Sequence, residues 1–139
     1  MTSIRSKKIL IIDDDPELGL VYKALLEREG YREIRLAKTG DKGLVVAQNW
    51  RPDLIISDIL HPGLDGFSVF EELFLNPTTL STRFIIVSGC SVPENPDYAE
   101  RAEATGVSVC LNKPVLLEEL LKVVYKVLAE AEEETRRGL

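Results

Sequence analysis

Five polar residues stand at or just beyond the ends of short apolar runs, where they could act together. Asp13 and Asp14 follow the first run, Asp58 the second, Ser88 the third and Lys113 the fourth. Three carboxylates, a hydroxyl and an ammonium suit phosphoryl transfer, which depends on positioning and on neutralising charge on the phosphoryl oxygens. In such a site Asp58 would attack phosphorus and form an aspartyl phosphate. Ser88 and Lys113 would each contact a phosphoryl oxygen.

The three acidic residues also predict a divalent metal. Like charges about 4 Å apart repel by roughly 1–4 kcal/mol, so without a cation one carboxyl group would remain protonated. Mg²⁺ (or Mn²⁺) accepts one or two carboxylates together with water and phosphate oxygens, which matches these ligands. Zinc would require His or Cys ligands, and the single His and two Cys of the chain have no metal-ligand spacing.

These polar residues need strands whose carboxyl ends meet at one rim. The apolar runs are too short for helices and rich in β-branched residues, which is typical of strands covered on both faces. A weaker segment, Glu33–Ala37, alternates polar and apolar residues and predicts an edge strand. The apolar runs are Ile9–Ile12, Leu54–Ile56, Phe84–Val87 and Val107–Leu111.

Helical patterns separate these strands. Asp15 and Pro16 are typical of a cap and first helical position, and Gly30 of a stop. The apolar stripe of this helix is Leu18, Val21, Tyr22, Leu25 and Leu26. Further helices are predicted at 39–49 (weakened by Gly43), 67–75 and 96–105, with a last one from near Val115. Alternation of this kind predicts a parallel sheet covered on both faces, with ligands at the carboxyl ends of its strands.

Length and composition predict one globular domain. The 139 residues, 45% hydrophobic and 29% charged, suit a core of about residues 7–129 and a charged helical tail at 130–139. The net charge of −6 argues against direct nucleic-acid binding, which needs a basic stripe. No apolar run is long enough for a signal peptide or membrane span, and the cysteines suggest no disulfide framework. A cytoplasmic location is therefore expected.

At these residues the sequence resembles the receiver domains of two-component response regulators, across nearly the whole chain. The matching motifs are residues 9–17, 52–59, 62–66, 85–89 and 111–114. The resemblance implies an α/β, flavodoxin-like fold: a doubly wound five-stranded parallel sheet in the order 2-1-3-4-5, with five helices. It also implies a signalling receiver, rather than an enzyme with a separate substrate, that catalyses its own phosphorylation and dephosphorylation at Asp58.

The resemblance further implies a ligand set and partners. Asp14 and Asp58 would bind Mg²⁺ directly, Asp13 would act through water, and the backbone carbonyl of Leu60 would complete the protein ligands. Ser88 and Lys113 would be the catalytic and switch residues. The phosphoryl donor would be a phosphohistidine on a sensor histidine kinase or a phosphotransfer protein.

The chain departs from the family pattern at three places. Cys110 replaces the aromatic switch residue, His61 replaces an apolar residue, and the loop at 90–97 is longer than is common. Because Cys110 has no ring to reorient, we expect the signal to be read from residues 89–97 and the helix that follows. A downstream protein, or a second copy of the chain, would bind the face formed by the fourth helix, fifth strand and last helix.

Other interpretations compete with this one. A phosphorylation-independent receiver-fold interaction module is the main alternative, suggested by Cys110. A phosphatase of the aspartyl-phosphate type is disfavoured, because Leu60 stands where a general acid would be needed. Asp15 is explained by helix capping alone, and His61 by an exposed loop. Ser88 and Lys113 would be unremarkable surface residues if each stood by itself.

Overall fold

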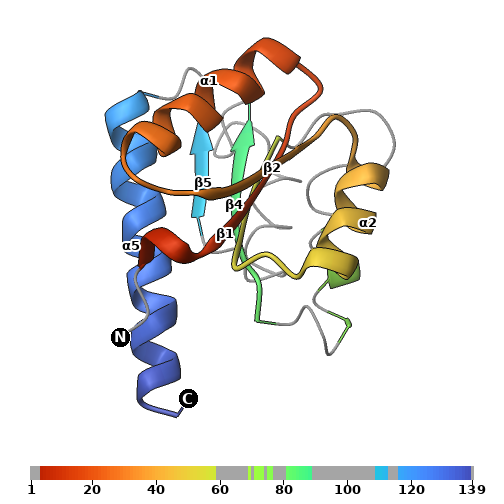
Figure 1. Cartoon of the computed structure of the whole chain (residues 1–139). Coiled ribbons are helices and arrows are strands. Elements are labelled where there is room, and N and C mark those ends of the chain that lie inside the picture. Colours follow the sequence, from red (N-terminus) through yellow and green to blue (C-terminus); the bar gives the residue numbers. More distant parts are fainter. Residues whose placement is uncertain are drawn as a thin grey trace.

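The computed structural model describes residues 4–58, 69, 71–73, 75–76, 81–88, 109–112 and 116–138, with residues 58, 88 and 109–112 described through their backbone. They form a parallel sheet flanked by helices (Figure 1). The 3-10 helix η1 (Ile4–Ser6) comes first. It is followed by β1 (Lys8–Ile12), α1 (Pro16–Arg28), β2 (Glu33–Ala37), α2 (Gly40–Trp50), β3 (Leu54–Asp58), β4 (Arg83–Ser88), β5 (Val109–Asn112) and α5 (Leu117–Arg136).

The five strands pair in the order β2-β1-β3-β4-β5, and every pair is parallel. This confirms the predicted doubly wound sheet and the edge position of the segment at 33–37. The helix predicted at 67–75 is described only at residues 69, 71–73 and 75–76, and the one at 96–105 lies outside the described residues. The count of five helices therefore stays a prediction.

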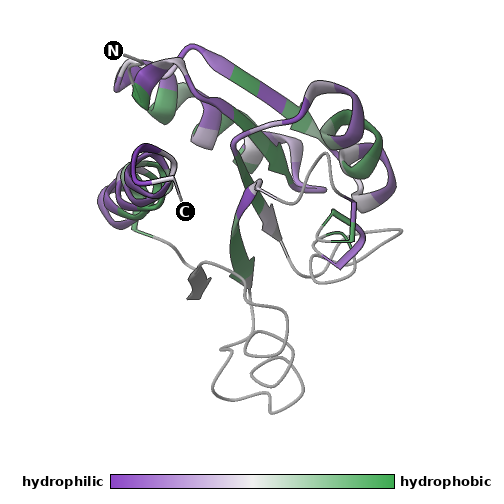
Figure 2. Ribbon diagram, turned by 90° about the horizontal axis from the view of Figure 1, so that it is seen from below, coloured by the Kyte–Doolittle hydropathy of each residue, from purple (hydrophilic) through white to green (hydrophobic). Residues whose placement is uncertain are grey.

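Alternation along the buried strands produces two cores, one on each face of the sheet. In β1, Ile9 and Ile11 pack with α1 and α5, whereas Leu10 and Ile12 pack on the α2 side. All four side chains are at most 1% exposed. Figure 2 shows α5 and α2 on opposite sides of the sheet. Each such burial stabilises the fold by roughly 1.5–3 kcal/mol, so a strand that is apolar on both faces belongs in the middle of the sheet.

Asp53 holds the amino ends of three strands in register. Its backbone N–H donates to the carbonyl of Lys8 (2.9 Å), and its Oδ2 accepts the N–H of Lys8 (2.8 Å). Its own carbonyl accepts the N–H of Arg83 (2.9 Å). One residue thus links the start of β1 and the start of β4 to β3, which fixes how far each strand reaches at the opposite end.

Gly43 allows α2 to lie close to the sheet. A Cβ atom added at Gly43 would lie 2.3 Å from Cδ1 of Ile12, far inside a normal contact. Glycine costs about 1 kcal/mol relative to alanine inside a helix, which is why it weakened the helix prediction here. The helix forms nonetheless, capped by Thr39, whose Oγ1 accepts the N–H of Lys42 (3.2 Å).

The amino-terminal segment is attached to the core by Arg5. Its guanidinium carbon lies 4.9 Å from the ring centroid of Tyr31 and 5.4 Å from that of Tyr125, and its Nε donates to the Glu29 carbonyl (3.0 Å). Burial raises the pKa of the Tyr31 hydroxyl, and the positive charge of Arg5 partly opposes that shift. Arg5 therefore joins the end of α1 to α5.

The predicted tail remains helical to Arg136. Glu134 forms an ion pair with Arg83 at the start of β4, so the end of α5 contacts the amino edge of the sheet. Both side chains are more than a third exposed, which limits the pair to about 0–1 kcal/mol. Among the described helices, none combines the length and apolar character that a membrane span requires.

Gly43→Ala should lower the free energy of unfolding by about 1–2 kcal/mol, because overpacking against Ile12 exceeds the gain in helix propensity. Gly19→Ala in α1 is the matched control, since its added Cβ would meet nothing closer than Cδ2 of Leu36 at 3.8 Å. Its stability should stay unchanged or rise by about 0.5–1 kcal/mol. Urea unfolding measures both, and Ile12→Val should recover part of the Gly43→Ala loss. Equal effects at the two glycines would contradict the close approach.

Candidate functional site

The carboxyl ends of β1 and β3 meet at the same level of the sheet. Ile12 is paired with Ser57, so Asp13 and Asp58 are the next residues on two adjacent strands. Neighbouring strands are about 4.8 Å apart, which places the two backbones close together. Ser57, the residue before Asp58, is fully buried.

The ends of β4 and β5 extend the same rim. Asp58 is paired with Val87, and Ser88 with Asn112, the residue before Lys113 in the sequence. The backbones of Asp58 and Ser88 therefore lie on neighbouring strands, one residue apart in level. The predicted convergence of strand ends is present in the described backbone.

Asp13 and Asp14 have different environments although they are adjacent. Asp13 is only 6% exposed. Its N–H donates to the carbonyl of Ala37 (3.0 Å), and its Oδ1 accepts the N–H of Asp15 (2.9 Å). Asp14 is exposed. Hydrogen bonding to a buried carboxylate offsets part of the cost of burial and fixes its orientation, whereas an exposed carboxylate can reach a ligand from solution.

Asp15 has a structural role. Its Oδ1 accepts the N–H groups of Glu17 (3.0 Å) and Leu18 (3.3 Å), and Pro16 occupies the first position of α1. These bonds satisfy backbone donors that no helical carbonyl can reach. The capping interpretation of Asp15 is confirmed, so the acidic run divides into a rim pair and a cap.

Other predicted site residues are described through their backbone or lie outside the described residues. Asp58, Ser88 and Cys110 are described through their backbone, and Cys110 is paired with Ile86 in the sheet. Leu60 and Lys113, like His61, lie outside the described residues. The metal ligand set and the contacts of the hydroxyl and ammonium groups stay predictions.

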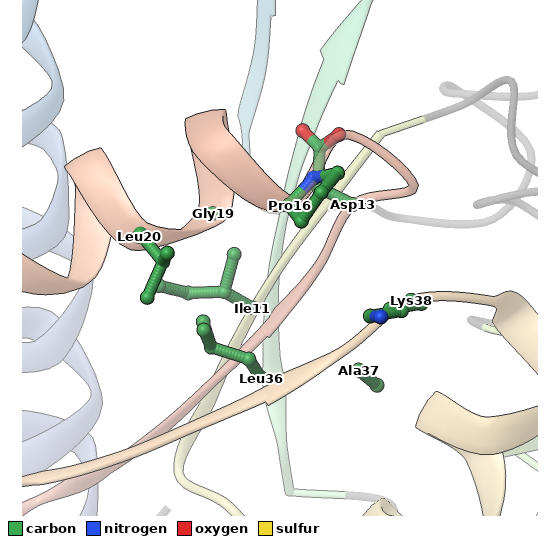
Figure 3. Close-up of a pocket in the computed structure, with 8 residues that line it drawn as sticks. All are labelled: Ile11, Asp13, Pro16, Gly19, Leu20, Leu36, Ala37 and Lys38. Atoms are coloured by element: carbon green, nitrogen blue, oxygen red, sulfur yellow. The ribbon is translucent and has the colours of Figure 1, made fainter.

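A pocket of about 190 Å³ lies beside Asp13, between α1 and β2, and the sequence did not predict it. Figure 3 shows the side chains of Leu20, Ile11 and Leu36 pointing toward one another there. The full lining is Ile11, Asp13, Pro16, Gly19, Leu20, Leu36, Ala37 and Lys38. The assignment of Val21 to the apolar stripe that packs α1 on the core is wrong. Val21 is 46% exposed, because it lies outside the helix face that buries Tyr22 and Leu26.

A parallel sheet in this order, with an acidic pair after β1 and an aspartate at the end of the adjacent β3, defines a receiver-type α/β domain. Comparison with known proteins agrees. The model of the response regulator receiver domain family matches residues 9–125. The chain belongs to this family.

Individual relatives differ in length. Protein PilH of Pseudomonas aeruginosa is 34% identical over 88% of this chain and 98% of its own length. The DNA-binding dual master transcriptional regulator RpaA of Synechocystis is 32% identical over 87% of this chain, which spans about half (48%) of that protein. The crystal structure of a CheY-like receiver domain protein from Methanospirillum hungatei has a TM-score of 0.84 at 29% identity, over 93% of this chain and 98% of that one.

Asp15→Ala should destabilise the protein by about 0.5–2 kcal/mol, because two N–H groups of α1 lose their acceptor. Asp15→Ser should retain most of the stability, since serine also caps helices. Chemical denaturation measures both, and Mg²⁺ affinity should be the same in each variant as in the wild type. A loss of metal binding with no loss of stability would show that Asp15 belongs to the rim site instead.

Proposed function

We propose that the chain is a phosphorelay receiver, which accepts a phosphoryl group on Asp58 in a Mg²⁺-dependent reaction and then changes conformation to control a partner. The observation that carries this proposal is the register of β1 with β3, which sets Asp58 beside the Asp13 rim position. Membership of the receiver family supports it.

In the proposed reaction a carboxylate oxygen of Asp58 attacks phosphorus as the bond from phosphorus to a histidine nitrogen of the donor breaks. The imidazole leaves with the electron pair of that bond and takes up a proton. Water later attacks the acyl phosphate, releasing inorganic phosphate and restoring the carboxylate. In both steps the protein positions the groups and neutralises charge on the phosphoryl oxygens.

The acidic residues at the end of β1 fit a hard dication. All donors proposed for the site are oxygens: the carboxylates of Asp13, Asp14 and Asp58, and the backbone carbonyl of Leu60. Mg²⁺ prefers such ligands and retains waters in its coordination shell. The buried, hydrogen-bonded Asp13 suits a contact through water, and the exposed Asp14 suits direct ligation. When bound, the metal would offset the repulsion among these carboxylates and the incoming phosphoryl group.

Ser88 and Lys113 would bind the other two phosphoryl oxygens and carry the change outward. A shift of the β4 end toward the new phosphoryl group would move the residues after it, 89–97, and the ammonium would hold the loop after β5. Because Cys110 has no ring to reorient, we propose that the signal is read from that loop and the following helix.

A histidine kinase or phosphotransfer protein in the cytoplasm is the proposed donor. The target would be a downstream protein that binds the face of the fourth helix, β5 and α5. The alternative, an interaction module without phosphorylation, gives no reason for two acidic residues at the end of β1 beside Asp58.

Incubation with acetyl phosphate and Mg²⁺ should add one phosphoryl group to the chain, because only Asp58 combines a strand-end position with neighbouring acidic residues. Intact-mass spectrometry measures the product. Asp58→Asn should remain unlabelled, while Asp41→Asn, which removes an exposed carboxylate from α2, should be labelled as the wild type is. Equal labelling of the Asp58→Asn variant would refute the assignment.

Asp14→Asn should weaken Mg²⁺ binding by at least about tenfold, since even outer partners of a metal site alter affinity by 10–100-fold. Isothermal titration calorimetry gives the affinity, with Asp41→Asn again as the control. Removing one carboxylate also relieves repulsion, so the metal-free variant should unfold at the same temperature as the wild type or above it. Undiminished affinity together with a lowered unfolding temperature would contradict a clustered-acid metal site.

A further inference from the structure

The outer edge of β2 has no partner strand within the described part of the chain. β2 stands at the end of the sheet order and is paired on one side with β1, as Figure 2 shows. The carbonyl of Ala37 points to β1, where it accepts the N–H of Asp13. Because backbone groups alternate along a strand, those of Ile34 and Leu36 point to the open side. Such an edge is a template for another strand.

An apolar patch accompanies this open edge. It consists of Leu20 on α1 and Leu36 on β2, which are 57% and 37% exposed. Leu20 and Leu36 converge over the pocket beside Asp13 (Figure 3). An exposed apolar cluster of this kind beside an unpaired strand marks a surface suited to association.

We propose that a second copy of this chain occupies this surface, with the two β2 strands pairing antiparallel about a two-fold axis at Ile34. In that register the outward-pointing backbone groups of Ile34 bond to those of its counterpart. Glu33 of each copy then lies opposite Arg35 of the other. Both side chains are exposed and share one face of the sheet, so symmetry gives two ion pairs.

Charge selects this register over its neighbour. A shift of the axis to Arg35 would keep the outward backbone groups facing each other but place two arginines opposite one another, which is unfavourable. Charged residues on an edge strand usually keep chains apart. Here Glu33 and Arg35 have opposite charges. Two identical copies therefore attract when the axis is at Ile34 and repel when it is at Arg35. The Arg35 guanidinium is already held over the Trp50 ring at 4.5 Å from its centroid, which restricts its conformations.

The same pairing would bring the two α1 helices together. α1 packs on both β1 and β2, and neighbouring strands are about 4.8 Å apart. A helix over the midline of β1 and β2 is therefore about 4.8 Å from the two-fold axis, and the two α1 helices would be about 9.6 Å apart. Packed helices are about 8–10 Å apart. Leu20 of one copy would therefore meet Leu20 of the other and leave water. The contact is isologous and closes at two copies. Because the two β2 strands are antiparallel, the strand ends that include Asp58 lie at opposite ends of the joined sheet.

This dimer does not depend on phosphorylation and uses a different face from the fourth helix, β5 and α5. Sedimentation velocity of the full chain over a concentration series should show a monomer–dimer equilibrium that weakens with added salt. Glu33→Arg should raise the dimer dissociation constant by about tenfold or more, because two attractive pairs become repulsive. The double variant Glu33→Arg/Arg35→Glu, with the pairs reversed, should restore most of the affinity. Glu130→Arg on α5, with the same charge change, should leave it unaltered.

A cross-link tests the register directly. Directly opposed residues of a non-hydrogen-bonded pair, as residue 33 of one copy and residue 35 of the other would be, have Cα atoms about 4.5 Å apart, within the range of a disulfide. Oxidised Glu33→Cys/Arg35→Cys, at two exposed positions, should form a covalent dimer, whereas the unaltered chain with its native Cys90 and Cys110 should not. A chain that stays monomeric at all concentrations, or a charge reversal that fails to recover association, would overturn the proposal. So would a dimer that Glu33→Arg leaves intact but Leu117→Glu on α5 abolishes.

Discussion

The parallel register of β1 with β3 is the constraint on which the site depends. Both strands are buried on two faces, and a slip of one residue would turn every side chain of a strand to the wrong core. Asp53 fixes the same register from the amino end, through two hydrogen bonds to Lys8. Asp13 and Asp58 therefore reach the rim at one level because the core permits no other alignment.

Packing on the two faces then gives each acidic residue its role. The turn after β1 buries Asp13, leaves Asp14 open to solvent and uses Asp15 to begin α1. On the other face, Gly43 lets α2 lie against Ile12, the last residue of β1. Loss of these contacts would therefore lower the stability of the fold, and through it the metal and phosphoryl binding proposed for the rim.

The sheet that builds the rim also leaves an edge. Doubly wound sheets bury their central strands and expose the outer ones, so β2 combines a buried Ile34 with exposed Glu33 and Arg35. The alternation that marked it as an edge strand in the sequence is the same feature that gives it complementary charges. Signalling at the rim and association at the edge would then be separate properties of one sheet.

The sequence by itself determined the local features: four apolar strands and the alternating strand at 33–37, the cap at Asp15 and Pro16, and acidic residues at strand ends. The periodicity of apolar residues indicates which face of a single helix or strand is buried. The strand order, in contrast, came from the family resemblance. Only the tertiary structure decided which strands are neighbours, that Val21 is exposed and that Asp13 is buried while Asp14 is not. Whether a residue is buried depends on the segments that pack against it, and these are distant in the sequence. A local pattern of side chains does not contain that information.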